Sequence, residues 1–316
     1  MANKINRRKF FKDATLATAG AIAGSEILGC TPSGKPSLTS TSPYPLMQEV
    51  MKYRKIDAHA HVGIEEGNLA EVLDFADRLG IEKFCVSKPI TNYSGKEPED
   101  PGVVRAYNDI VMHAVKQHPD RLIGYFTLNP RYPKESLEEI ERCVDMGMLG
   151  YKGYTQVKIS DPLYYPVIEK LIDHKLIVFM HAFCQIGMGG YRMKYDIGKW
   201  YNTSIPEDFV EISKKYPEAI FQFAHIGGGG DWEYECKMLK DSPNVYVDTS
   251  GSNNEEHMID FAIQYLGEDR LFFGTDMSFY QGVGKIFASN LTESQKRKIF
   301  YGNYQNAIKK LGRNVM

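Results

Sequence analysis

The stretch Ile56-Asp57-Ala58-His59-Ala60-His61-Val62-Gly63 decides how the rest of the chain is interpreted. It is a short apolar run that carries two histidines one residue apart and ends in glycine. On a β-strand, residues i and i+2 point to the same face, so His59 and His61 would present two imidazoles side by side. Imidazole is the commonest metal-ligating side chain. The alternative is a polar pair on a solvated strand, and further ligands elsewhere in the chain decide between the two.

Length and composition indicate a globular protein. The 316 residues suffice for one large barrel or two ordinary domains. A hydrophobic content of 43% and a charged content of 25% are typical of a chain that buries a sizeable core. The net charge of −2 gives no electrostatic reason to expect nucleic acid or an acidic membrane surface as a partner. We therefore expect a small-molecule substrate, and a homo-oligomer is compatible with the sequence.

Residues 1–30 resemble an export signal. Asn6-Arg7-Arg8-Lys9-Phe10-Phe11-Lys12 is similar to a twin-arginine motif, and Ile27-Leu28-Gly29-Cys30 is similar to a bacterial lipoprotein cleavage box. Residues 31–50, rich in Pro, Ser and Thr, are typical of a flexible tether. We predict an exported protein on the periplasmic side, held to a bacterial membrane only through a lipid on Cys30. The alternative is a cytoplasmic enzyme with a basic N-terminus.

From residue 51 to the end, short apolar runs alternate with amphipathic helical segments. The eight strand candidates lie at 56–61, 84–86, 122–128, 149–152, 176–180, 220–224, 245–247 and 271–273. Their continuous apolar character is expected of parallel strands that are covered on both faces. Eight such units predict an α/β fold, a single-domain (β/α)8 TIM barrel over residues 51–316. A doubly wound open sheet is the alternative, but no G-x-G-x-x-G follows the first strand.

Polar residues recur where these strands end. In chain order they are Lys152, His181, His225, Asp248 and Asp276, at the ends of the fourth to eighth strands. In a TIM barrel the carboxyl ends of all strands share one face, which supplies the catalytic groups. We therefore expect these side chains to converge with the histidine pair of the first strand. The other histidines, which lie in or beside helical stretches, are interpreted as surface residues: His113, His118, His174 and His257.

Taken in order with their neighbours, these residues resemble the amidohydrolase superfamily. The resemblance is to the amidohydrolase-related branch, which holds metal hydrolases and metal-dependent non-oxidative decarboxylases. The matching segments are His59-Ala60-His61, Gly150-Tyr151-Lys152, Val178–His181, Phe223–Gly228, Phe273–Asp276 and Tyr301–Ala307. The resemblance spans about residues 54–312 and implies a barrel enzyme that uses a divalent metal.

The resemblance also implies residue roles. His59, His61, His181 and Asp276 match metal ligands, and Asp276 would also take the proton of a metal-bound water. His225 matches either a ligand of a second metal or a catalytic acid/base.

Lys152 matches a lysine that some relatives carbamylate to bridge two metals. Here Gly153-Tyr154 follows it, where relatives often carry leucine and histidine. We therefore predict a single metal.

The donor types agree with this interpretation on chemical grounds. Three neutral imidazoles and a carboxylate suit Zn²⁺ with one position open for water, and Mn²⁺, Fe²⁺ and Co²⁺ accept the same donors. Bound Zn²⁺ lowers the pKa of water to about 7, so that a hydroxide can attack a carbonyl carbon. The catalytic residues would be Asp276 as proton acceptor, with His225 or Lys152 stabilising the developing negative charge.

We predict a metal-dependent hydrolase of an amide, ester or lactone carbonyl. The alternative enzyme is a metal-dependent non-oxidative decarboxylase of a small carboxylic acid, in which His225 handles a proton. The alternative of another class is an inactive surface-binding lipoprotein. Arg192, in a long insertion at 184–204, suits a substrate carboxylate, and Asp248 is a second candidate for substrate contact.

Overall fold

The computed structural model describes residues 45–63, 69–90, 100–184, 202–228 and 231–314. The chain divides after Pro45 into two units, and the helices and strands described below belong to the second, Leu46–Met316. The predicted export signal, Cys30 and most of the predicted tether lie outside the described residues. Among the described residues, no helix has the length and apolar character needed to cross a membrane.

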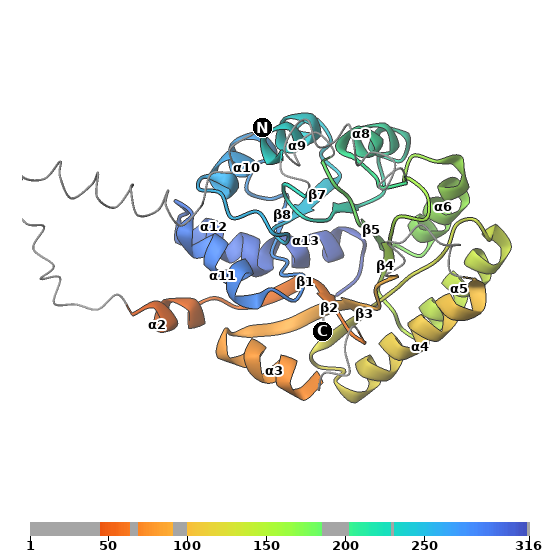
Figure 1. The fold of residues 1–316 in the computed structure, drawn as a ribbon, viewed down its shortest axis with the longest axis horizontal. Helices are drawn as coiled ribbons and strands as arrows, with labels where there is room; N and C mark the ends of the chain where they lie inside the picture. Colours follow the sequence, from red (N-terminus) through yellow and green to blue (C-terminus); the bar gives the residue numbers. More distant parts are fainter. Residues whose placement is uncertain (1–44, 64–68, 91–99, 185–201, 229–230, 315–316) are drawn as a thin grey trace, which may run out of the picture. The chain divides into compact units, whose positions relative to one another are not determined.

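Eight parallel strands form the sheet in the order β1 to β8 (Figure 1). They are β1 (Lys55–His61), β2 (Ile81–Ser87), β3 (Leu122–Phe126), β4 (Gly150–Gly153), β5 (Ile177–Met180), β6 (Phe221–Phe223), β7 (Val245–Asp248) and β8 (Leu271–Phe272). Ala58 N donates to Phe273 O over 2.8 Å and Asp276 N donates to His59 O over 2.8 Å, so the chain after β8 bonds back to β1. The sheet is therefore a nearly closed barrel, and the predicted (β/α)8 fold is confirmed.

Apart from α2, which precedes β1, the helices follow the strands, and most of them surround the barrel (Figure 1). They are α2 (Leu46–Met51), α3 (Leu69–Arg78), α4 (Pro101–Gln117), α5 (Pro133–Asp145), α6 (Tyr165–Asp173), α8 (Pro206–Lys215), α9 (Trp232–Leu239), α10 (Met258–Leu266), α11 (Phe279–Ala288), α12 (Glu293–Arg297) and α13 (Asn303–Lys310). Short helical turns are η1 (Pro162–Tyr164) and the π-turn η3 (Lys298–Gly302). The apolar faces of these helices pack on the outer faces of the strands in one large buried cluster.

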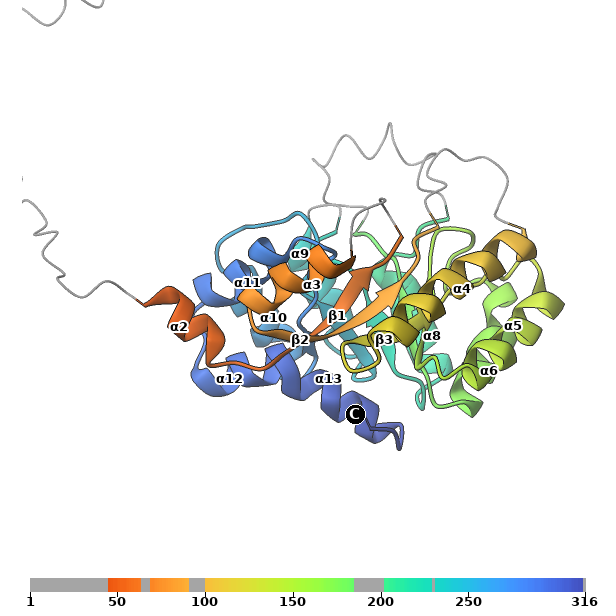
Figure 2. The same cartoon turned by 90° about the horizontal axis from the view of Figure 1, so that it is seen from below.

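A second buried cluster fills the inside of the barrel. It takes side chains from β1, β2, β3, β5, β7 and β8 and from the residues on either side of β6, among them Tyr125 and Phe272. The helix α13 lies across the end where the strands begin (Figure 2), and its Tyr304 contributes to this cluster. Tyr304 OH lies 2.9 Å from Tyr125 OH. Packed side chains therefore close one end of the barrel, and the open rim is at the carboxyl ends of the strands.

Two helices differ from the sequence expectation. Leu46–Met51 forms α2 at the end of the stretch that the composition assigned to a tether. Phe279–Ala288 forms α11, although no helix was expected there, since Gly282 and Gly284 lower its helix propensity. A Cβ atom on Gly282 would lie 2.9 Å from Thr275 Cγ2. Glycine at this position therefore lets α11 approach the segment after β8 closely.

Candidate metal centre

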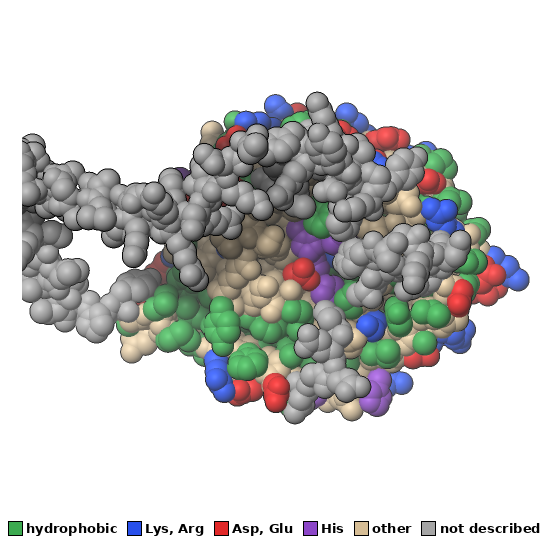
Figure 3. Space-filling model, viewed as in Figure 1, with side chains coloured by type: hydrophobic (Ala, Val, Ile, Leu, Met, Phe, Trp, Pro, Cys, Tyr) green, Lys and Arg blue, Asp and Glu red, His purple; other side chains and the backbone are tan. Residues whose placement is uncertain are grey.

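The carboxyl ends of the strands bring the predicted site residues together at one rim. On this face, histidine side chains gather in a hollow beside an acidic side chain (Figure 3). His59, His61, His181 and His225 are all buried, each with at most 8% of its surface exposed. Asp276 is more open, with 36% of its side chain exposed. The strand ends therefore place these side chains at one rim.

His59, His225 and Asp276 form the centre of the group. Each offers one ligand atom, and the three atoms lie within 4.8 Å of one another. His61 Nε2 lies 2.9 Å from Asp276 Oδ1, and His59 Nε2 lies 3.5 Å from the same oxygen. His181 stands beside His225, with its Nδ1 3.1 Å from His225 Nε2. His61 and His181 thus stand beside these three, His61 next to Asp276 and His181 next to His225.

Unusual backbone conformations aim these side chains at the centre. His225, Asp276 and Met277 have φ values of 66°, 49° and 68°, in the left-handed region that non-glycine residues seldom adopt. In β1, the register to β2 shifts between Asp57 and Ala60, as in a β-bulge. Bulges beside active sites commonly redirect side chains, and strained residues persist where surrounding contacts hold them.

Hydrogen bonds on the outer side of the group fix how His61 is protonated. His61 Nδ1 lies 3.3 Å from Ser87 O and 3.1 Å from Ser87 Oγ. A carbonyl oxygen only accepts, so His61 Nδ1 carries the hydrogen and Nε2 carries a lone pair. Burial lowers the pKa of His61 to about 4, which leaves the ring neutral at neutral pH. The Nε2 lone pair therefore faces the Asp276 oxygen 2.9 Å away, an arrangement of two acceptors that a bound cation would stabilise.

Asp276 is anionic in this setting. Burial by itself raises the pKa of Asp276, but His59, His61 and His225 outweigh it and hold that pKa below its ordinary value. Neutral imidazoles and an ionised carboxylate are the donors that Zn²⁺ and Mn²⁺ accept in proteins. The residues present therefore fit a divalent cation in donor type and, for His61, in the direction of the Nε2 lone pair.

Lys152 lies under the histidines. Its Nζ is 3.2 Å from His59 Nε2 and 3.3 Å from the centroid of the Phe179 ring. Burial lowers the pKa of Lys152 to about 7, although Asp248 and Asp276 oppose the shift. The face of an aromatic ring attracts a cation and repels an anion. The contact with Phe179 therefore fits an unmodified lysine better than a carbamate.

Asp248 and Ser250 support the group from β7 and the residues after it. Asp248 is fully buried, and its carboxylate accepts hydrogen bonds from Gln222 Nε2 over 3.0 Å and from His225 N over 3.1 Å. Ser250 Oγ lies 3.0 Å from His59 Nδ1. A buried carboxylate with these partners orients its neighbours. Substrate contact by Asp248 stays a prediction.

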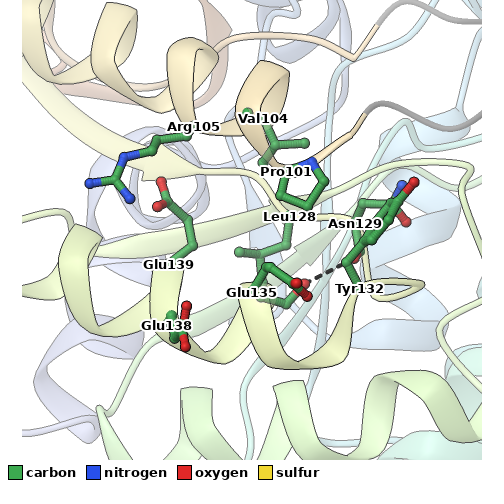
Figure 4. Close-up of a pocket in the computed structure, with 11 residues that line it drawn as sticks. Pro101, Val104, Arg105, Leu128, Asn129, Tyr132, Glu135, Glu138 and Glu139 are labelled. Atoms are coloured by element: carbon green, nitrogen blue, oxygen red, sulfur yellow. Dashed lines mark hydrogen bonds between the residues drawn. The ribbon is translucent and has the colours of Figure 1, made fainter.

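Ser250 was missed in the sequence, where a serine after a strand is typical of an ordinary turn. Its place directly after a strand end was the one available signal. Arg192 lies outside the described residues. A separate cavity of about 240 Å³ lies between α4 and α5 and is lined by Arg105, Glu135 and Glu139 among others (Figure 4). None of the predicted site residues lines it.

Comparisons with known proteins agree with this geometry. A model of the amidohydrolase family matches residues 56–304. A 2-amino-3-carboxymuconate-6-semialdehyde decarboxylase of Dictyostelium discoideum is 22% identical over 275 residues, which cover 77% of this chain and 74% of that protein.

Two solved structures share the fold. A 5-carboxyvanillate decarboxylase from Sphingomonas paucimobilis has a TM-score of 0.65 at 16% identity, covering 81% of this chain and 99% of that one. A dihydroxybenzoic acid decarboxylase from a Polaromonas species, solved with bound manganese and the inhibitor 2-nitroresorcinol, has a TM-score of 0.66 at 20% identity, covering 83% and 98%. With the family model matching residues 56–304 of a barrel that carries these rim histidines, the chain belongs to the amidohydrolase family.

Proposed function

We propose that this protein is a metal-dependent non-oxidative decarboxylase of a small carboxylic acid. The observation that carries the proposal is the rim group in which His61 Nε2 lies 2.9 Å and His59 Nε2 lies 3.5 Å from Asp276 Oδ1, in a family whose relatives reported above are decarboxylases. The sequence favoured hydrolysis, and these relatives favour its alternative instead. A complete group of ligand-type side chains gives no support to an inactive binding protein.

We infer that His59, His61, His181 and Asp276 hold one divalent cation. A relative with this fold binds manganese, whereas the sequence led us to expect zinc, and imidazole with carboxylate suits both ions. When bound, the cation would hold the substrate carboxylate and a neighbouring oxygen, and would stabilise the negative charge that develops as CO₂ leaves.

His225 is our candidate for proton transfer. Decarboxylation breaks one carbon–carbon bond, leaves the electron pair on the substrate carbon and requires one proton at that carbon. Burial, helped by the nearby His59, lowers the pKa of His225 to about 3, so its ring is neutral and its lone pair can accept a hydrogen bond from a substrate hydroxyl. The proton would pass to the ring when a bound cation lowers the pKa of that hydroxyl. Passing that proton to the carbon completes the balance and regenerates the neutral ring.

Lys152 is our candidate for charge stabilisation. With a pKa of about 7, caused by burial, a large fraction of its amine is protonated at neutral pH. Its Nζ lies 3.2 Å from His59 Nε2 and is therefore next to the group of rim side chains. A fixed positive charge in a buried site stabilises an electron pair that accumulates on the substrate.

The proposed reaction is tested by assaying metal-loaded protein against two matched panels. One panel holds carboxylic acids that carry a hydroxyl or carbonyl oxygen beside the carboxylate, and the other holds related esters, amides and lactones. Release of CO₂ with a product that gains hydrogen at the same carbon supports decarboxylation. Addition of water to a substrate without release of CO₂ would show that the hydrolase prediction was right.

A variant of His225 separates proton transfer from metal binding. His225→Asn should lower CO₂ release by at least about 100-fold, the usual contribution of acid–base catalysis. Its metal content should stay close to that of the wild type. His113→Asn, on the exposed side of α4, is the matched control and should retain full activity.

Export and lipid attachment at Cys30 remain our proposal from the sequence motifs. Expression of the full chain with radiolabelled palmitate, beside Cys30→Ser, tests it. Label on the wild type alone supports attachment, and label on neither protein contradicts it.

A further inference from the structure

Ser250 joins two histidines and a carboxylate that come from three different strands. It lies two residues after the end of β7 and is 1% exposed. Its Oγ is 3.0 Å from His59 Nδ1, 2.9 Å from His225 Nδ1 and 2.5 Å from Asp248 Oδ1. One hydroxyl group therefore has three close polar neighbours.

Counting hydrogens shows in which direction each bond runs. A hydroxyl has one hydrogen to donate and two lone pairs to accept with. Asp248 Oδ1 already accepts from His225 N and Ser250 N, each over 3.1 Å, so this oxygen is an acceptor. The hydrogen in the short contact must come from Ser250 Oγ. Both lone pairs of Ser250 Oγ are then left for the two imidazoles, so His59 Nδ1 and His225 Nδ1 must each donate.

We propose that Ser250 is a positioning residue that sets the tautomer of His225 and, together with Asp248 Oδ2 at 3.1 Å from His59 Nδ1, that of His59. With hydrogen on both Nδ1 atoms, both Nε2 atoms carry lone pairs. The Nε2 atom of His59 lies 3.5 Å from Asp276 Oδ1, and that of His225 lies 3.1 Å from His181 Nδ1. The effect of these tautomers on function rests on the proposed metal site and proton transfer. The lone pair of His59 would bind the cation, and that of His225 would accept the proton.

The partners of the two Nε2 atoms agree with this assignment. His59 Nε2 is 3.2 Å from Lys152 Nζ, which in its protonated form can only donate to it. His225 Nε2 is 3.1 Å from His181 Nδ1, which can donate to it. In that arrangement the hydrogen of His181 lies on Nδ1 and its lone pair on Nε2. The Ser250 hydroxyl thus bears on the hydrogen positions of His59 and His225 directly and on that of His181 through His225.

The backbone around Ser250 is held by a buried lysine. Lys285 Nζ, from α11, donates to Gly251 O over 2.6 Å and to Thr249 O over 3.2 Å. Gly251 has a φ of 95°, and a Cβ atom there would lie 3.1 Å from His225 Cβ. The segment therefore approaches His225 closely and is fixed on both sides of Ser250, which leaves the hydroxyl little freedom to move.

Imidazole nitrogen NMR of the metal-free protein tests the assignment without any substrate. ¹⁵N-histidine labelling distinguishes a protonated nitrogen from one with a lone pair, and single His→Gln variants assign the rings. We expect Nδ1–H and a bare Nε2 for both His59 and His225 at neutral pH. A hydrogen on Nε2 of either ring in the wild type would overturn the proposal, whether or not any variant folds.

Two variants then test what the hydroxyl does. Ser250→Ala removes it, and Mn²⁺ affinity, measured by EPR of the free ion, should weaken roughly 10- to 100-fold, as when other partners of metal-bound histidines are lost. Ser250→Thr keeps the hydroxyl and should restore the wild-type tautomers and affinity. Ser252→Ala, on the exposed part of the same segment, is the control and should change neither.

The proposal is wrong if Ser250→Ala keeps both the Nδ1–H tautomer of His225 and the Mn²⁺ affinity of the wild type; Asp248 Oδ2 can hold the hydrogen on His59 Nδ1 in that variant. None of these measurements uses CO₂ release, so a failure of the proposed reaction and a failure of this inference give different results. A protein that binds Mn²⁺ with the expected tautomers but decarboxylates nothing would retain the role of Ser250 and lose the proposed reaction.

Discussion

Thr275 Oγ donates a hydrogen bond of 2.5 Å to Asp57 Oδ2, and Thr275 N donates to Asp57 Oδ1 over 3.0 Å. Asp57 lies in β1 and Thr275 lies just after β8, so the pair fastens the last strand to the first. Asp57 Oδ1 also accepts from His59 N over 3.0 Å. The closure of the barrel and the position of His59 therefore depend on the same buried carboxylate.

Removing the hydroxyl of Thr275 should destabilise the barrel at this point. Thr275→Val keeps the shape of the side chain but leaves Asp57 Oδ2 without that donor. An unsatisfied buried acceptor costs about 1–3 kcal/mol, so the free energy of unfolding in urea should fall by that amount. Thr275→Ser keeps the hydroxyl and should stay much closer to the wild type. Equal stability of the valine and serine variants would show that the bond contributes little.

Metal removal should lower the thermal stability of the protein. The acceptors of His61 and Asp276 face each other at 2.9 Å, and a cation relieves that repulsion. A ligand that binds only the folded state stabilises it by about 2.7 kcal/mol at 100 times its Kd. We expect the Tm of chelator-treated protein to rise when Mn²⁺ is added. No rise at saturating Mn²⁺ or Zn²⁺ would contradict a metal site.

The same measurement separates rim histidines from surface histidines. His61→Ala should abolish most of the Mn²⁺-dependent rise in Tm. His113→Ala, on an exposed position of α4, should show the full rise. A full rise in both variants would remove His61 from the proposed ligands.

Lys152 should work as an unmodified amine. If it were carbamylated and bridged metals, dialysis against CO₂-free buffer would reduce the metal content, and bicarbonate would restore it. We expect metal content and activity to be independent of bicarbonate, since the Nζ atom lies 3.3 Å over the face of the Phe179 ring. Lys152→Met should retain the metal and lose turnover. A metal content that follows bicarbonate would instead support a carbamate.

The barrel could be predicted from the sequence because each strand is a short apolar run with a polar residue at its end. His59, His181, His225 and Asp276 could be predicted to converge, since parallel strands bring their carboxyl ends to one face. Ser250 could not, because its role exists only through contacts with side chains from other strands. The helix α11 was missed for a similar reason, since its glycines suit a close packing contact that no local pattern reveals.

The choice between hydrolysis and decarboxylation was also beyond the sequence. Both reactions use the same imidazoles and carboxylate to hold a metal, so ligand type and spacing are identical in the two cases. What differs is the substrate that the rim admits. Arg192, the residue predicted to meet a substrate carboxylate, lies outside the described residues. The decarboxylase proposal therefore depends on relatives and not on any one side chain of the site.

The stability of the barrel should depend on pH through Lys55, at the end opposite the metal centre. Lys55 Nζ is buried and donates to Val50 O over 2.7 Å and to Tyr53 O over 2.8 Å. Burial lowers the pKa of Lys55 from 10.5 to about 8 in the folded protein, with Glu82 opposing the shift. Between these two pH values the unfolded chain still holds the proton that the folded chain has released. The contribution of Lys55 to the free energy of unfolding therefore rises with pH across this window and is lost as pH falls through about 8.

Comparison with Lys55→Met isolates this contribution, because every other group is common to the two proteins. The variant loses two hydrogen bonds and should be less stable at all pH values. A neutral amine still has two hydrogens for Val50 O and Tyr53 O, so deprotonation keeps both bonds. The difference in free energy of unfolding should therefore grow in favour of the wild type as pH rises, by no more than about 3 kcal/mol. Urea titrations across this window measure this difference. If the free energy of unfolding changes with pH by the same amount in both proteins, burial does not destabilise the protonated Lys55 amine.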